Sequence, residues 1–350
     1  MAEETRMRVG LCDSGELSDE NLTFARQLGI TSVRSGTPRN WLPGEQQWEY
    51  EDLLRLRKRV ESFGLKYEVI ENVPQHFFDK VMLGLPGRDE QIAHYCTTIR
   101  NMGRAGIPIL GYHFMPNAVW RTSRTAPGRG GAHVTAFDMA LVGQTSAVEQ
   151  RAFVQNASPA IDEMWAEVDA LTVSAEQMWE NYAYFLKAVL PVAEASGVTL
   201  ALHPDDPPMP SLAGISRIFI SVENFKRAYA IANGSQAWAL DLCLGCCSEM
   251  PGGATNVREM IEYFAPKGRI AYVHFRDVQG TVPQFAECFI GEGNFNAAET
   301  MRLLKRSGFT GFLLDDHVPQ MVEDTPWGHR GRAHAIGYMQ GLLDAIEAFQ

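Results

Sequence analysis

Short apolar runs alternate with amphipathic stretches along most of the chain. The runs have the length of buried strands, and the longer stretches repeat apolar residues every three to four positions, as helices do. Eight runs predict strands, at residues 8–12, 31–34, 65–71, 107–114, 198–203, 237–243, 269–275 and 311–316. Regular alternation of strands with helices is typical of a parallel sheet whose helices lie outside it.

Most of the intervening stretches predict helices that a glycine ends. The clearest are residues 51–63, 89–102, 175–195, 222–233, 257–264 and 297–307. Glycine just past a helix takes the left-handed conformation that closes the last turn. Eight strand–helix repeats in 350 residues predict a single α/β domain, a (β/α)8 TIM barrel over residues 1–350. A doubly wound open sheet is the alternative, and the eight-fold count favours the closed barrel.

One segment interrupts this alternation. Residues 117–172 lie between the fourth strand and its helix, and they hold a Gly/Arg-rich piece at 125–131 followed by a mixed helical pattern. A connection of this length inside a compact domain is usually functional. We therefore expect an insertion that acts as a lid.

Composition and charge narrow the class of protein. Hydrophobic residues make up 45% and charged residues 21%, which is the balance of a folded globular chain. The net charge of −11 argues against a nucleic-acid partner. Three of the six cysteines crowd into positions 243–247, which suits a reducing compartment better than a disulfide framework. Because no signal-peptide pattern or membrane-length apolar run is present, we expect a cytoplasmic protein without a membrane partner.

Metal-ligating side chains stand at the ends of four consecutive predicted strands. The fifth strand ends in His203, the sixth in Cys243, the seventh in His274 and the eighth in Asp315 and Asp316. The carboxyl ends of barrel strands share the face where active sites lie. One such residue would ordinarily be a packing residue, but four in register are hard to explain by packing. Imidazole, thiolate and carboxylate together favour Mn²⁺, Fe²⁺, Co²⁺ or Zn²⁺ over Mg²⁺ or Ca²⁺.

Further polar residues at this end are candidates for binding a substrate. An acidic protein that binds an anion needs a local cation, and arginine pairs with a carboxylate through two parallel hydrogen bonds. Arg276 is the preferred candidate because it follows His274 closely. The other candidates are Glu71, His76, His113 and Arg121.

The motifs in this pattern resemble those of the mannonate dehydratases. The resembling segments are residues 69–76 (VIENVPQH), 112–116 (YHFMP), 120–122 (WRT), 203–208 (HPDDPP), 209–217, 243–245 (CLG), 274–276 (HFR) and 316–317 (DH). They occur in family order over nearly the whole chain. The resemblance implies a xylose-isomerase-like barrel with a divalent metal, usually Mn²⁺. It also implies conversion of D-mannonate to 2-keto-3-deoxy-D-gluconate by loss of water.

The resemblance implies roles for individual residues as well. His203, Cys243, His274 and Asp316 would hold the metal, and His317 would be a catalytic acid/base. Dehydration needs one group to take the proton beside the carboxylate and another to protonate the departing hydroxyl. Asp315 and His329 are further candidates for these proton transfers. The chain departs from the family pattern at His113, Val119, Ala286 and Ile290, and it has no tyrosine in the stretch at 326–330.

Three other functions remain open at this point. A sugar or sugar-acid isomerase or epimerase could use the same metal and acid/base, and it would keep the formula of its substrate. A metal-dependent phosphoesterase on a similar barrel would need several clustered metals and a basic face. A binding protein without activity would have no need to retain Asp316 and His317 together. We expect the partner to be a small sugar acid and the protein to be a homo-oligomer.

Overall fold

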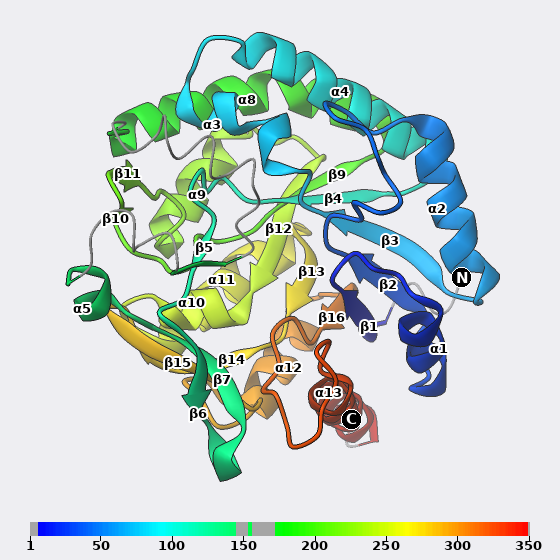
Figure 1. Cartoon of the computed structure of the whole chain (residues 1–350), viewed down its shortest axis with the longest axis vertical. Coiled ribbons are helices and arrows are strands. Elements are labelled where there is room, and N and C mark those ends of the chain that lie inside the picture. Colours follow the sequence, from blue (N-terminus) through cyan, green and yellow to red (C-terminus); the bar gives the residue numbers. More distant parts are fainter. Residues whose placement is uncertain (1–5, 145–152, 156–171, 349–350) are drawn as a thin grey trace.

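Eight parallel strands form a closed barrel (Figure 1). The computed structural model describes residues 6–144, 153–155 and 172–348. Around the barrel the strands follow one another in chain order: β1 Arg8–Asp13, β2 Ser32–Ser35, β3 Lys66–Glu71, β4 Ile109–Tyr112, β9 Thr199–Leu202, β12 Trp238–Cys243, β13 Ile270–His274 and β16 Phe312–Leu314. The predicted (β/α)8 barrel is confirmed.

Helices surround the barrel and connect its strands (Figure 1). The long ones are α1 Asp19–Gln27, α2 Tyr50–Ser62, α4 Arg88–Ala105, α8 Ala175–Ser196, α9 Val222–Ile231, α11 Ala254–Phe264, α12 Ala297–Arg306 and α13 His329–Ala348. The short ones are α3 Asp79–Leu83, α5 Met139–Val142 and α10 Leu244–Glu249. Helix α12 illustrates the local cause, because Asn296 caps its first turn while Met301 and Leu304 are buried on one face.

Two of the barrel strands end earlier than their apolar patterns suggest. Strand β4 stops at Tyr112 and not at 114, and β16 stops at Leu314 and not at 316. The predicted bounds are wrong here because the chain leaves the sheet before its polar residues. Asp316 has φ +49°, a left-handed backbone that no regular strand contains.

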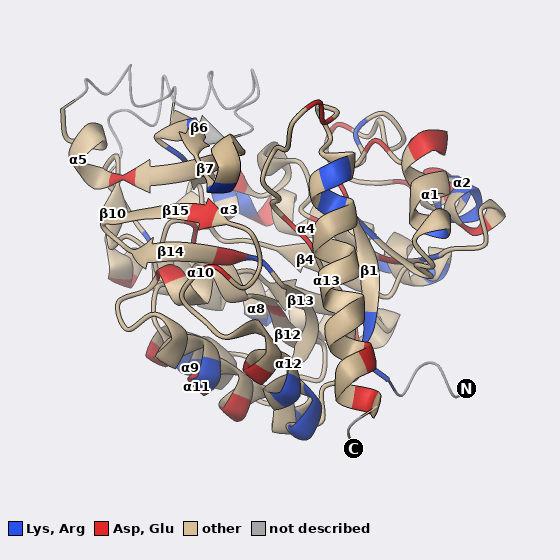
Figure 2. Cartoon of the chain, turned by 90° about the horizontal axis from the view of Figure 1, so that it is seen from below, with Lys and Arg blue, Asp and Glu red and all other residues tan. Residues whose placement is uncertain are grey.

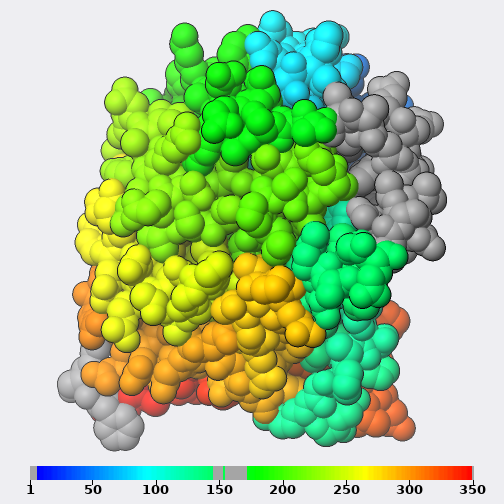
Figure 3. Space-filling model, turned by 90° about the vertical axis from the view of Figure 1, so that its left-hand side faces the viewer, coloured from blue at the N-terminus to red at the C-terminus, as the bar shows by residue number. Residues whose placement is uncertain are grey.

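A second, smaller sheet joins two long connections beside the barrel. Its order is β14 Asp277–Thr281, β15 Gln284–Cys288, β7 His133–Asp138 and β6 Ser123–Pro127. Figure 2 shows β14, β15 and β7 lying one above the other, and in Figure 3 the segment that contains β6 and β7 packs beside the hairpin β14–β15. Buried apolar side chains support this sheet, among them Trp120, Phe137, Val278 and Phe285.

The sheet corrects part of the expectation for the insertion. The helical pattern expected after residue 131 is wrong at His133–Asp138, which pairs with β15 as an antiparallel strand. That partner lies about 150 residues away in the sequence, so local periodicity could not indicate it. Residues 145–152 and 156–171 of the expected insertion lie outside the described residues.

Short strand pairs complete the described connections. They are β5 Val119–Trp120 with β8 Val154–Gln155, and β10 Ser211–Leu212 with β11 Ile215–Ser216. Among the described helices, none combines the length and apolar character needed to span a bilayer.

Close packing inside the barrel predicts that Gly111→Ala is destabilising. A Cβ atom on Gly111 in β4 would press on the hydroxyl of Tyr272 and lie 2.7 Å from Cγ of Glu71. Both neighbours are buried, so the added methyl should lower the free energy of unfolding by about 1–3 kcal/mol in chemical denaturation.

The matched control is Gly341→Ala on helix α13, where an added Cβ meets no atom within 4 Å. Helix propensity should make this control neutral or slightly stabilising. Equal effects of the two substitutions would contradict the packing described here.

Candidate active site

Four of the predicted ligands converge at the carboxyl end of the barrel. Cys243 and His274 are the last residues of β12 and β13, where they pair in register, and His203 directly follows β9. The donor atoms of Cys243, His274 and Asp316 all lie within 4.8 Å of one another. His203 shares a similar group with Cys243 and another with His274. We call His203, Cys243, His274 and Asp316 the ligand cluster.

The backbone at Asp316 brings two neighbouring side chains to the same place. Along a regular strand Asp316 and His317 would point to opposite faces. The left-handed φ of +49° at Asp316 breaks that alternation. As a result Oδ2 of Asp316 lies 3.5 Å from Nδ1 of His274, and Oδ1 lies 3.8 Å from Nε2 of His317. Such a conformation is strained for a residue other than glycine, and it is typical of functional sites.

Hydrogen bonds fix both histidine rings of the ligand cluster. The Nδ1–H of His203 donates to the carbonyl of Pro204 at 2.6 Å, which turns Nε2 away from that bond. The Nε2–H of His274 donates to Glu71 at 3.1 Å, and its Nδ1 has no hydrogen-bond partner among the described residues. Metal-ligating histidines usually donate their other N–H to an oxygen in this way. The ligand cluster therefore fits a divalent cation.

The electrostatics of the ligand cluster also favour a cation. Burial alone lowers the pKa of His203, but Asp241 and the bond to Cys243 outweigh burial and raise it to about 10. Burial alone raises the pKa of Asp316, yet His317 and His274 hold it well below its usual range. The negative potential that retains a proton on the His203 ring also favours a metal ion, and a bound metal ion would displace that proton.

Arg276 binds carboxylates of the protein itself. It is almost fully buried, and its Nε donates to Asp316 at 2.9 Å, while Nη1 donates to Glu249 at 2.9 Å. Its Nη2 donates to Asp206 at 2.9 Å and to Cys246 Sγ at 3.1 Å. The guanidinium thus fills the space among Asp206, Cys246 and Glu249, whose ligand atoms also lie within 4.8 Å of one another.

Arg121 is engaged in the same network. It reaches the barrel from the insertion after β4, and its side chain has no exposed surface. Its Nη1 donates to the Trp120 carbonyl and to Asp206, its Nη2 to Asp206 and to Glu287, and its Nε to Thr135. All five N–H donors are therefore in use. The expected binding of a substrate carboxylate by Arg121 or Arg276 stays a prediction, because protein acceptors hold these donors in the structure.

His317 lies at the edge of the ligand cluster and is partly exposed. Its Nδ1 is 2.7 Å from Oε1 of Glu287, a bond in which the ring donates to the carboxylate. Burial lowers the pKa of His317, but the carboxylates of Asp316 and Glu287 outweigh it, and the net shift is upward. The ring therefore has one fixed nitrogen, Nδ1, and one, Nε2, that is available for chemistry.

Two predicted substrate residues lie against the ligand cluster. Glu71 is buried, pairs with Arg34 and accepts hydrogen bonds from His274 and Tyr272. His113 accepts a hydrogen bond from the backbone N–H of residue 115 at 3.1 Å. Burial, together with the neighbouring His203, lowers the pKa of His113 to about 3, so its ring is neutral.

Three other predicted residues do not belong to any group of clustered ligand atoms in the described chain. Asp315 is buried, and it accepts a hydrogen bond from Arg332 at 2.7 Å. His76 lies on a 3₁₀ turn, with Nε2 2.9 Å from the Glu45 carbonyl. Their suggested roles stay predictions.

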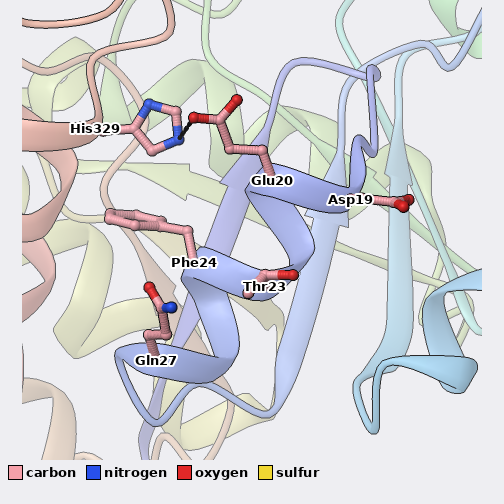
Figure 4. A pocket seen from close by; sticks show the side chains of 6 residues that line it. All are labelled: Asp19, Glu20, Thr23, Phe24, Gln27 and His329. Carbon is pink, nitrogen blue, oxygen red and sulfur yellow. Dashed lines mark ion pairs between the residues drawn. The ribbon is translucent and has the colours of Figure 1, made fainter.

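The third, His329, lines a surface pocket between α1 and the start of α13 (Figure 4). Its Nε2 lies 3.7 Å from Glu20, and its Nδ1 lies 2.6 Å from the hydroxyl of Thr325. The other residues lining the pocket are Asp19, Thr23, Phe24 and Gln27. A catalytic role for His329 also stays a prediction.

Sequence reasoning missed the acidic residues around the two arginines. Asp206 stands inside the HPDDPP run that was singled out, and Glu249 follows Cys246 by three residues on α10. Glu287 lies on a strand that pairs with the insertion. What distinguishes these carboxylates is that they are buried beside arginines, and the sequence alone does not show which acidic residues are buried.

Comparisons with known proteins agree with the resemblance found in the sequence. A family model described as D-mannonate dehydratase (UxuA) matches residues 15–350. Mannonate dehydratases of Geobacillus thermodenitrificans and Thermotoga maritima are each 32% identical to the chain, over 327 and 335 residues. These alignments cover 87% of the chain and 86% and 88% of the two relatives.

Solved structures give the same result for the fold. The mannonate dehydratase from Streptococcus suis serotype 2 superposes with a TM-score of 0.84 at 30% identity, covering 97% of this chain and 93% of that one. An L-ribulose 3-epimerase superposes with a TM-score of 0.57 at 16% identity, covering 98% and 96%, which shows a shared barrel only.

The ligand cluster predicts that Asp316→Asn removes metal binding while the fold is kept. Asparagine tolerates the left-handed backbone of this position as well as aspartate does, so the variant should fold. It lacks the carboxylate charge, so it should lose the bound divalent metal in elemental analysis and in titration with Mn²⁺. The matched control, Asp344→Asn on the exposed side of α13, should bind metal as the wild type does. A full metal equivalent on the Asp316 variant would contradict the ligand cluster.

Proposed function

The chain belongs to the D-mannonate dehydratase family of hydro-lyases, which dehydrate a sugar acid, and we propose on this basis that it converts D-mannonate to 2-keto-3-deoxy-D-gluconate. We propose that a divalent metal assists the reaction, with Mn²⁺ preferred and Fe²⁺, Co²⁺ or Zn²⁺ as alternatives. The observation that carries the proposal is the ligand cluster at the barrel mouth with His317 beside it.

The proposed metal ligands are His203, Cys243, His274 and Asp316. Support comes from the two oriented imidazoles, of which His274 has an Nδ1 that forms no hydrogen bond with the described residues. A bound divalent cation supplies Lewis-acid stabilisation for the negative charge that develops when the proton beside a carboxylate is removed. Glu71 and the Pro204 carbonyl would hold the two rings in the tautomers that this binding requires.

His317 is the proposed acid/base of the reaction. Dehydration takes the proton from C2, beside the substrate carboxylate, and releases the 3-hydroxyl as water, which leaves an enol that becomes the ketone. The Nδ1–H of His317 donates to Glu287, so in the neutral ring Nε2 carries the lone pair that can accept a proton. His317 would perform one of the two proton transfers, and Asp315 and His329 are candidates for the other.

The two connections that form the smaller sheet would close over this site. Strands β6 and β7 come from the insertion, and β14 and β15 follow the ligand His274. We propose that the insertion over residues 117–172 acts as the lid of a single domain and excludes water from the reaction.

All six cysteines belong to the described residues and none is in a disulfide, which suits the proposed cytoplasmic location.

A screen of aldonic and uronic acids tests the proposed substrate. With Mn²⁺ present, D-mannonate should give a 2-keto-3-deoxy acid, detected by periodate–thiobarbiturate colour and by mass spectrometry as a loss of one water. A product of unchanged mass would identify an isomerase or epimerase instead. Turnover of another aldonate and not of mannonate would contradict the substrate and keep the reaction type.

The role of His317 predicts a variant that binds metal and barely turns over. His317→Gln should keep its metal equivalent and its unfolding midpoint while kcat falls by roughly 10²–10⁴, the usual contribution of a positioned acid/base. The control His94→Gln lies on helix α4, outside the ligand cluster, and should retain full activity. If excess Mn²⁺ restores the rate of the His317 variant, the side chain serves metal binding and the acid/base role is wrong.

A further inference from the structure

A buried carboxylate on the hairpin β14–β15 accepts a hydrogen bond from the proposed acid/base, His317. Glu287 lies on β15, thirty positions before His317 in the sequence, and only 7% of its surface is exposed. Its Oε1 accepts the Nδ1–H of His317 at 2.7 Å. The contact joins two different connections of the barrel, since Glu287 lies on β15 and His317 follows β16.

Two arginines also contact Glu287. Nη2 of Arg121 donates to the same Oε1 at 2.8 Å, and Nη1 of Arg276 lies 3.5 Å away. Arg121 comes from the insertion, and β15 pairs with β7 of the same insertion. The carboxylate that meets His317 is therefore fixed by both connections of the smaller sheet.

Neutralising the arginines does not account for Glu287. Arg121 is already paired with Asp206 through two hydrogen bonds, and Arg276 donates to the same Asp206 and to Glu249 and Asp316. A fourth buried carboxylate beside two guanidinium groups costs free energy unless another donor compensates it. Nη2 of Arg121 is one such donor, and the N–H of His317 is the other.

A carboxylate on one ring nitrogen decides what the other nitrogen can do. With Nδ1 protonated and bonded to Glu287, the neutral ring has its lone pair on Nε2, the nitrogen that lies 3.8 Å from Asp316. Without that acceptor the proton can occupy Nε2, and the ring can rotate. In hydrolase triads a buried carboxylate serves the same purpose for the catalytic histidine.

We propose that Glu287 is a positioning residue for the dehydration. From its place on the smaller sheet it fixes the tautomer and the orientation of His317. This inference rests on the proposed acid/base role of His317. Glu287 itself transfers no proton and touches no metal ligand in this account. It also gives the smaller sheet a chemical function, since the sheet places the group that orients the acid/base.

Three variants test the proposal by steady-state kinetics with Mn²⁺ and D-mannonate. Glu287→Ala should lower kcat by about 10–100-fold while KM changes by less than about three-fold and metal content stays the same. Glu287→Gln keeps an oxygen acceptor and the side-chain volume, so its kcat should lie between those of the wild type and the alanine variant. Glu292→Gln, a carboxylate near the end of the same hairpin that pairs with the exposed Arg129, is the control and should match the wild type.

The tautomer itself can be measured by ¹⁵N NMR of the histidine rings in the Zn²⁺-loaded protein, with His317→Gln used for assignment. The wild type should show Nδ1 protonated, and Glu287→Ala should show protonation shifted towards Nε2. Wild-type kcat in Glu287→Ala, or a lower rate explained fully by lost metal, would overturn the proposal even if His317→Gln is inactive. Full activity of His317→Gln would instead overturn the acid/base role and, with it, this inference.

Discussion

The balance of buried charge at the barrel mouth is the constraint on which the rest of the site depends. Two guanidinium groups with almost no exposed surface lie among four carboxylates, namely Arg121 and Arg276 among Asp206, Glu249, Glu287 and Asp316. Buried carboxylates are tolerated only when cations and N–H donors surround them. The arginines therefore fix the carboxylates, and through Asp316 and Glu287 they fix the ligand cluster and His317. The four acidic groups outnumber the two guanidinium groups, which suits a site that holds a divalent metal.

The barrel supplies the rigid part of this arrangement and the connections supply the rest. Strands β12 and β13 end in register at Cys243 and His274, so their relative position is set by backbone hydrogen bonds of the sheet. Asp316 needs a left-handed backbone to reach the same point, and it is retained there by Arg276. Burial of Glu249 beside Asp206 raises its pKa to about 8, another sign that the mouth holds more acidic groups than cations. The smaller sheet then brings Glu287 and Arg121 from two connections that no local sequence signal relates.

The sequence alone could predict the features that depend on local patterns, and it could not predict those that depend on contacts between distant segments. The eight strands could be predicted because apolar runs and helix periodicity are local. Cys243 and His274 could be found because each ends a strand, and His203 because it directly follows one. Strand β7 pairs with the distant strand β15 as well as with its neighbour β6, so the helical pattern expected after residue 131 is wrong there. The charge of Arg276 and its position beside His274 indicate a substrate ligand, but only the folded structure reveals the carboxylates that it already binds. Glu287 carried no signal for the same reason, because its partner His317 belongs to another connection.

The position of a bound manganese ion shows whether the ligand cluster is the metal site. Crystals grown with Mn²⁺ and measured at the manganese absorption edge should show one anomalous peak within coordination distance of His203, Cys243, His274 and Asp316. Arg276 should remain bonded to Asp316 and Glu249 in the same crystals. A peak among Asp206, Cys246 and Glu249, with Arg276 displaced, would contradict the account, because the arginine would then be standing in for the metal and not supporting it.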